Sequence, residues 1–218
     1  MTAISKPPVP TGRRVYRSPR RSEQAERTRR EILRAAEMLF AERGYAAVSV
    51  SDIAVRAGVA VATVHAAGGK REILSQVIEE AVTAGRGTPV GADPDGPEVA
   101  DMATADSAIR LHVRNVHALK SRGARAHRVL WRAAASDPDA AEVWKAFLER
   151  MYRGQLTLTV RLAELGALRA DLDPTSAADI LQALMRPEAS DALVIDRGWT
   201  LDRWSEYVED ATRRLLLA

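Results

Sequence analysis

The sequence predicts an all-α protein, and three observations support that fold class. Apolar residues recur three and four positions apart through most of the chain, which places them on one face of a helix. Ser, Thr, Asp and Pro stand where helices would begin, and Gly stands where several would end. Alternating apolar and polar runs bounded by turns are absent from the sequence, so no strand is predicted.

We expect residues 1–21 to form a disordered basic arm, because they hold four prolines and few apolar side chains. Nine Lys and Arg stand against two Glu in the first thirty residues, a charge of +7, so the remaining residues carry −4 within the overall +3. A basic arm beside a mildly acidic body is typical of a chain that meets a polyanion at one end. A solvated tail is the alternative interpretation.

A DNA-binding domain of the helix-turn-helix type is predicted over residues 22–69. Its first helix starts near Ser22 and stops at Gly44, a residue suited to a helix end. Ser49 caps a short second helix that ends at Gly58, and a third helix follows until Gly68 and Gly69 interrupt it. The small Ala54 suits the point where the second and third helices cross, and three apolar residues lock them together. These are Ile53, Val59 and Val64.

Residues 70–218 are predicted to form a helical ligand-binding and dimerisation domain. A fourth helix spans about 70–84, and a loop rich in Gly and Pro spans 85–97. The pairs Asp137-Pro138 and Asp173-Pro174 each combine an N-cap with proline at the first helical position. The helices expected after the loop cover about 106–121, 124–136, 138–165, 175–185, 187–196 and 200–217.

A recognisable pattern covers about residues 27–74. It consists of the stretch from Arg30 to Tyr45 and of Val48-Ser49-Val50, Ile53-Ala54, Ala57-Gly58-Val59 and Thr63-Val64. These residues resemble the N-terminal domain of the TetR/AcrR family of transcriptional repressors. The resemblance implies an all-helical homodimer whose small-molecule ligand, bound in the C-terminal half, weakens operator binding. His65 stands where the family usually has Tyr, and the segment from His65 to Lys70 is one residue short and lacks an apolar residue, which predicts altered packing of the third helix on the fourth.

Side-chain chemistry predicts which residues contact DNA. The third helix is apolar, so Val61 and Ala62 offer methyl contacts, whereas Thr63 and His65 form hydrogen bonds with bases. Phosphates are expected to contact Ser49 at a helix N-terminus, Lys70 and the basic arm. The arginines of this arm suit an adjacent minor groove. The predicted DNA-binding residues are Ser49, Ala60, Val61, Ala62, Thr63, His65, Lys70, Arg17, Arg20 and Arg21. A helix surface that is merely polar is the alternative for Thr63 and His65.

Apolar residues with sparse polar groups predict a small-molecule site in the C-terminal half. The predicted ligand-binding residues are His112, Asn115, Trp131, Trp144, Met151 and Gln155. An ordinary helical core has the same composition and stays the alternative.

The last two segments predict a homodimer, because they carry more apolar residues than two helices can bury in one small domain. These are Ile180, Leu181, Leu184, Leu193, Val194, Trp204, Val208 and Leu215. A dimer also suits DNA, since two recognition helices read the half-sites of a near-palindromic operator. The expected partners are double-stranded DNA, an unidentified small-molecule effector and a second copy of the chain.

Several classes of protein are disfavoured by what the sequence lacks. The chain has no Cys, no HExxH, no Walker loop, no GxGxxG and no GxSxG, so we expect no enzyme, no cofactor and no metal site. No apolar run approaches the roughly 18 residues that span a bilayer, so we expect a cytoplasmic protein without a membrane partner. Three alternatives remain: an all-α ligand-binding or scaffold protein with weakened DNA binding, an all-helical enzyme, and a DNA-binding activator. Salt-dependent DNA binding would argue against the first, and turnover of a ligand would reveal the second. The third depends on where the operator lies, which the sequence does not address.

Overall fold

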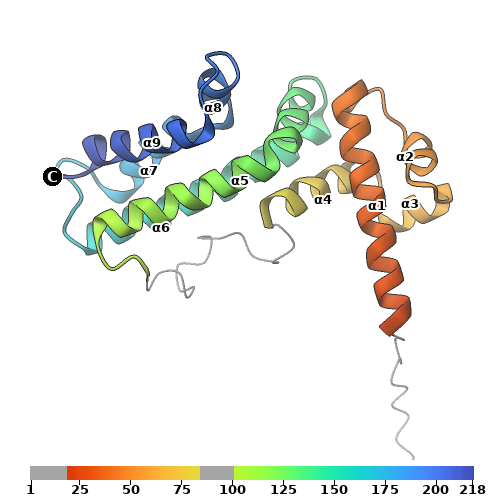
Figure 1. The fold of residues 1–218 in the computed structure, drawn as a ribbon, viewed down its shortest axis with the longest axis horizontal. Helices are drawn as coiled ribbons and strands as arrows, with labels where there is room; N and C mark the ends of the chain where they lie inside the picture. Colours follow the sequence, from red (N-terminus) through yellow and green to blue (C-terminus); the bar gives the residue numbers. More distant parts are fainter. Residues whose placement is uncertain (1–18, 84–100) are drawn as a thin grey trace, which may run out of the picture.

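A computed structural model describes residues 19–83 and 101–218, and these residues form nine helices (Figure 1). The predicted loop over 85–97 lies outside the described residues, whose fold is all-α as the sequence predicts. The helices are α1 (Pro19–Arg43), α2 (Val50–Ala57), α3 (Val61–Ala67), α4 (Lys70–Thr83), α5 (Ala105–Ala134), α6 (Pro138–Glu164), α7 (Pro174–Met185), α8 (Pro187–Val194) and α9 (Leu201–Leu216).

The molecule is elongated, with α1, α2 and α3 at one end and α7, α8 and α9 at the other (Figure 1). The long helices α5 and α6 pack side by side and connect the two ends. Helix α1 begins at Pro19 rather than near Ser22, so it takes in the last residues that the sequence assigns to the basic arm.

The prediction of two helices over 106–121 and 124–136 is wrong, because α5 runs unbroken from Ala105 to Ala134. Gly123 lies in its interior, where it makes room for an imidazole ring. A Cβ at this position would come within 2.8 Å of Cε1 of His127. The glycine therefore serves side-chain packing and does not end the helix.

Two hydrophobic cores lie at opposite ends of α5 and α6. The first joins α1 to α4 with the C-terminal half of α5 and the start of α6. The second joins the N-terminal half of α5 with the later part of α6 and with α7 and α9. Helix α4 buries Ile73, Leu74, Val77 and Ile78 in the first core, so it packs with the helices that precede it as well as with α5 and α6.

The apolar residues near the C-terminus are largely buried within one chain, which corrects the argument for a dimer. Leu181, Trp204 and Val208 are almost fully buried in the second core, and most of the others pack against it. Leu215 remains 40% exposed. The predicted surplus of unburied apolar side chains is therefore small, because α5 and α6 cover the residues that α7 and α9 present.

In the described part of the chain, no single helix is both long and apolar enough to cross a membrane. Only α2 and α3 taken together reach that length and composition, and they are bent by 109°.

Candidate functional site

The N-terminus of α2 is fixed by a reciprocal pair of hydrogen bonds between Ser49 and Asp52. The amide of Asp52 donates to Oγ of Ser49 at 3.1 Å, and the amide of Ser49 donates to Oδ2 of Asp52 at 2.8 Å. Arg43 of α1 also contacts this carboxylate at 3.0 Å. The hydrogen bonds from Ser49, and then the one from Arg43, lower the pKa of Asp52 to about 2. The capping box therefore holds α2 in a defined place against α1.

The turn after α2 has the backbone geometry that the sequence predicts. Gly58 adopts φ 68° and ψ 30°, the left-handed conformation that glycine reaches without a steric penalty. Ile53, Ala54 and Val64 are buried between the helices, and α2 and α3 meet at 109°. This is the angle range of a helix-turn-helix.

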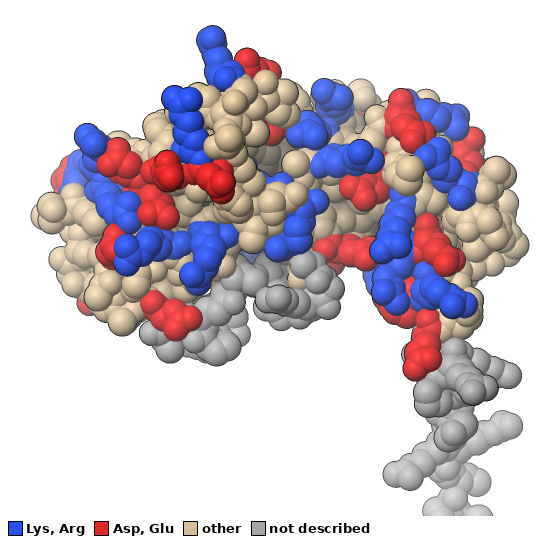
Figure 2. Space-filling model, in the orientation of Figure 1, with Lys and Arg blue, Asp and Glu red and all other residues tan. Residues whose placement is uncertain are grey.

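Helix α3 turns its remaining side chains to solvent. Val64 is buried, whereas the residues predicted to face DNA on this helix are exposed: Ala60, Val61, Ala62, Thr63 and His65. On the face drawn in Figure 2, the region of α3 is largely uncharged, and basic and acidic side chains alternate along the neighbouring α1. An uncharged helix beside one that carries exposed arginines suits base contacts from the first and phosphate contacts from the second.

The junction of α3 and α4 explains the short segment from His65 to Lys70. Gly68 has φ +138°, and a Cβ there would lie 2.8 Å from Cβ of Glu72. The two helices thus approach too closely for any side chain at this position. Nε2 of Gln76 in α4 donates to the carbonyl oxygen of Ala67 at 2.8 Å, and Ala67 also packs against the first core. The junction thus combines a polar contact with apolar packing, and the altered packing relative to the family stays a prediction.

Lys70 and Ser49 make contacts within the protein. Nζ of Lys70 donates to the carbonyl oxygen of Tyr45 at 3.0 Å and lies 4.2 Å from the centre of its ring. The Ser49 hydroxyl bonds Asp52, as described above. Arg17 lies outside the described residues. Arg20 and Arg21 belong to α1, but their side chains are not described.

Arg29 is a residue that the predicted DNA-binding set omits. Its Nε donates to Oε1 of Gln76 at 2.9 Å, which places this exposed arginine of α1 close to the end of α3. The two partners are 47 residues apart in sequence, so no local pattern signals the contact.

The six predicted ligand-binding residues lie in different surroundings, and their grouping into one site stays a prediction. Trp131 is 42% exposed on α5 and does not join a buried set. His112 and Gln155 are buried and Asn115 is half-buried, while Met151 packs against the first core. Trp144 stacks on Phe147 and lines an open groove of about 380 Å³ between α6 and α7.

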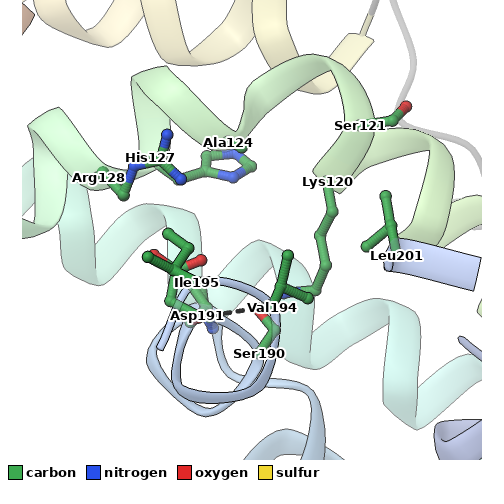
Figure 3. Close-up of a pocket in the computed structure, with 11 residues that line it drawn as sticks. Lys120, Ser121, Ala124, His127, Arg128, Ser190, Asp191, Val194, Ile195 and Leu201 are labelled. Carbon is green, nitrogen blue, oxygen red and sulfur yellow. Dashed lines mark hydrogen bonds between the residues drawn. The ribbon is translucent and has the colours of Figure 1, made fainter. Parts of the chain in front are cut away.

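A separate cavity of about 220 Å³ lies between α5 and α8 (Figure 3) and contains none of the six. Its polar residues are Lys120, Ser121, His127, Arg128, Ser190 and Asp191. No pattern in the sequence indicates these residues as a group, because α8 lies against α5 only in the folded chain.

Part of the chain matches a known protein family. Residues 32–77 match the sequence model of the bacterial regulatory proteins of the tetR family. The match covers α2, α3 and most of α1 and α4. A comparison with curated protein sequences finds no match.

Solved structures with the same fold cover most of the chain. The SmeT–triclosan complex aligns with a TM-score of 0.70 at 23% identity over 88% of this chain and 92% of that one. NalD, the secondary repressor of the MexAB-OprM multidrug efflux pump in Pseudomonas aeruginosa, gives 0.69 at 23% identity over 88% and 98%. A transcriptional regulator from Saccharomonospora viridis in complex with choline gives 0.66 at 23% identity over 88% and 99%. The likeness extends beyond the helix-turn-helix to the helices that follow it.

Proposed function

We propose that this protein is a ligand-responsive transcriptional repressor, because residues 32–77 match the model of the tetR family of bacterial regulatory proteins and the fold resembles that of such regulators. It binds a near-palindromic operator as a homodimer, and a small molecule bound in its C-terminal half releases it from DNA. The structural neighbours include a repressor of an efflux pump and complexes with triclosan and with choline, which supports a regulator that responds to small molecules.

The observation that carries the proposal is the exposed face of α3 on a rigidly held helix-turn-helix. The capping box at Ser49, the left-handed Gly58 and the buried Val64 fix this helix, while Val61 and Thr63 face outward. A helix held in this way fits the major groove of B-DNA, which is about 12 Å wide. Methyl groups of Val61 and Ala62 suit thymine, and the hydroxyl of Thr63 suits a base edge.

Helix α4 supplies the connection between effector and DNA. It shares the first core with α5 and α6, and Glu79 pairs with Arg150 of α6. About one turn before Glu79, Gln76 bonds the last residue of α3. A shift of α5 or α6 on ligand binding therefore moves α4 and, through it, α3. A difference of about 1–3 kcal/mol in ligand affinity between the two conformations gives coupling of the usual size.

The test is binding of the purified protein to the DNA upstream of its own gene across a salt series. We expect selective binding with a two-fold symmetric footprint and an affinity that falls steeply with salt. Val61→Ser should weaken selective binding at least tenfold, because the loss of a methyl contact leaves a thymine unmatched. Val55→Ser is the matched control on the exposed side of α2 and should leave binding unchanged. Equal effects of the two substitutions would contradict the assignment of α3 as the reading helix.

A second function is favoured by the positions of Lys70 and Ser49, whose polar groups bond within the protein. A helix-turn-helix in which these two side chains are engaged within the protein suits a ligand-binding protein that has weak affinity for DNA. Binding that ignores DNA sequence in the same salt series, with Val61→Ser and the wild type alike, would favour this function over the repressor.

A further inference from the structure

The cavity between α5 and α8 holds a buried ammonium group with one hydrogen-bond partner. Lys120 of α5 is 8% exposed, and its Nζ donates to Oγ of Ser190 at 2.6 Å. The centre of the Trp204 ring lies 4.7 Å from Nζ of Lys120. In Figure 3 the Lys120 side chain descends from α5 toward Ser190 of α8. Lys120 forms no ion pair with any residue that the structure describes, so two of its three donors remain for a ligand.

The charges around Lys120 leave the cavity positive. Arg128 lines it from α5 and, like Lys120, has no ion pair among the described residues. On α8, Asp191 lines the cavity and is half-buried. Glu188 also lies on this helix and pairs with Arg186. Among the residues that line the cavity, two cations face one carboxylate, so the lining itself carries one positive charge, which a single negative charge would neutralise. Asp196 also lies near Asp191 but does not line the cavity.

His127 adds a second polar group to the same wall. It is 5% exposed, and its Nε2 has no hydrogen-bond partner in the described structure. Burial, with the nearby Lys120 and other cations, lowers the pKa of His127 to about 3, so its ring is neutral near pH 7. A neutral imidazole donates from one nitrogen, and Gly123 gives the ring its space.

The remaining walls are apolar and the space is small. Ala124 of α5, Val194 and Ile195 of α8 and Leu201 of α9 line a volume of about 220 Å³. That volume is below the usual range for drug-sized ligands, so it suits a compact molecule. A carboxylate with a short apolar body matches each wall, because its oxygens accept from Lys120 and His127 while its hydrocarbon meets the aliphatic side chains.

We propose that this cavity binds a small monocarboxylic acid, with Lys120 as the cation that selects the acid over its neutral analogues. The inference rests on the proposed function, since it names the chemical class of the effector. A buried ammonium without a direct ion pair is costly, and an anion that contacts it in the cavity reduces that cost.

The test compares acids with amides of the same shape in calorimetric titrations of the full chain without DNA. The probes are acetate and acetamide, butyrate and butyramide, and benzoate and benzamide. We expect at least one acid to bind tenfold or more tightly than its amide. Lys120→Met keeps the stem of the side chain and should abolish this preference. Lys145→Met, the same change at an exposed position of α6, should leave it intact.

Asp191→Asn provides a variant that acts in the opposite direction and spares the buried lysine. It removes the competing carboxylate, so affinity for the acid should rise several-fold while affinity for the amide stays the same. A panel in which no acid is preferred overturns the proposal, as does a preference that survives Lys120→Met or is unmoved by Asp191→Asn. If Lys120 had only a structural role, Lys120→Met would lower thermal stability without changing the ratio of the acid affinity to the amide affinity. Because DNA is absent from these titrations, failure of operator binding does not affect their outcome.

Discussion

Nε2 of Gln76 in α4 lies 2.8 Å from the carbonyl oxygen of Ala67, the last residue of α3. Oε1 of the same side chain accepts a hydrogen bond from Arg29 of α1 at 2.9 Å. One amide thus joins the helix proposed to read DNA, the neighbouring α1 and α4, which packs against α5.

Gln76→Ala removes both hydrogen bonds and should lower the free energy of unfolding by about 1–2 kcal/mol. It should also weaken operator binding, because α3 loses its tie to α4. Chemical denaturation and DNA titration measure the two effects. Gln182→Ala is the control, since Nε2 of Gln182 donates to the Leu148 carbonyl between α7 and α6, far from α3. An equal loss of DNA affinity in both variants would contradict a local role for Gln76.

Gly68→Ala should be more destabilising than the same change at another glycine with positive φ. Gly68 combines φ +138° with a 2.8 Å clash of the new Cβ against Glu72, whereas Gly166 has φ +64° and open space. The strain at Gly166 costs about 1–2 kcal/mol, and the clash adds about 1–3 kcal/mol at Gly68. The difference between the two midpoints of urea unfolding measures the destabilisation that comes from the close approach of α3 and α4. Identical midpoints would show that the junction relaxes freely.

Ser49→Ala separates the capping role of this residue from a contact with phosphate. The chain has a second capping box at Thr104 and Ser107, at the start of α5. Loss of either cap should cost about 1 kcal/mol of stability. If Ser49 also contacts DNA, Ser49→Ala weakens operator binding at a temperature where both variants are folded, and Thr104→Ala does not. Unchanged operator affinity in both would restrict Ser49 to capping.

Acid should destabilise the protein below pH 6.5 through two buried histidines. Desolvation lowers the pKa of His112 to about 4, and desolvation with nearby Lys120 lowers that of His127 to about 3. The unfolded chain takes up protons at the ordinary pKa of 6.5 while the folded chain does not, so this stability is complete above about pH 7 and is lost as pH falls. Each histidine contributes about 1.4 kcal/mol per pH unit below 6.5.

Denaturant unfolding at pH values from 7.5 to 5 measures this slope. His112→Leu should roughly halve it, because one of the two proton uptakes disappears. A slope that matches the wild type would show that His112 takes up its proton in the folded state.

Local chemistry made most of the helices predictable from the sequence. A cap at Ser49, the Asp-Pro pairs and the glycine at position 58 act within a few residues, so their outcome does not depend on distant parts of the chain. The exposed face of α3 follows from the same local spacing, since one buried position, Val64, decides which way the helix turns. The prediction of a break between 121 and 124 was wrong because Gly123 makes room for the ring of His127. The sequence does not distinguish a glycine that packs against a side chain from one that ends a helix.

Long-range contacts decided the features that the sequence did not predict. The sequence alone determined an all-α chain with a helix-turn-helix near its start, because helix propensity, capping and apolar period are local properties. Only the tertiary structure brought Lys120 to Ser190, 70 residues apart, and left Trp131 on the surface. Only the tertiary structure tied Lys70 to Tyr45 and buried Trp204 within a single chain. The physical reason is that burial and charge pairing depend on which helices pack together, and many packings are compatible with the same pattern of apolar residues.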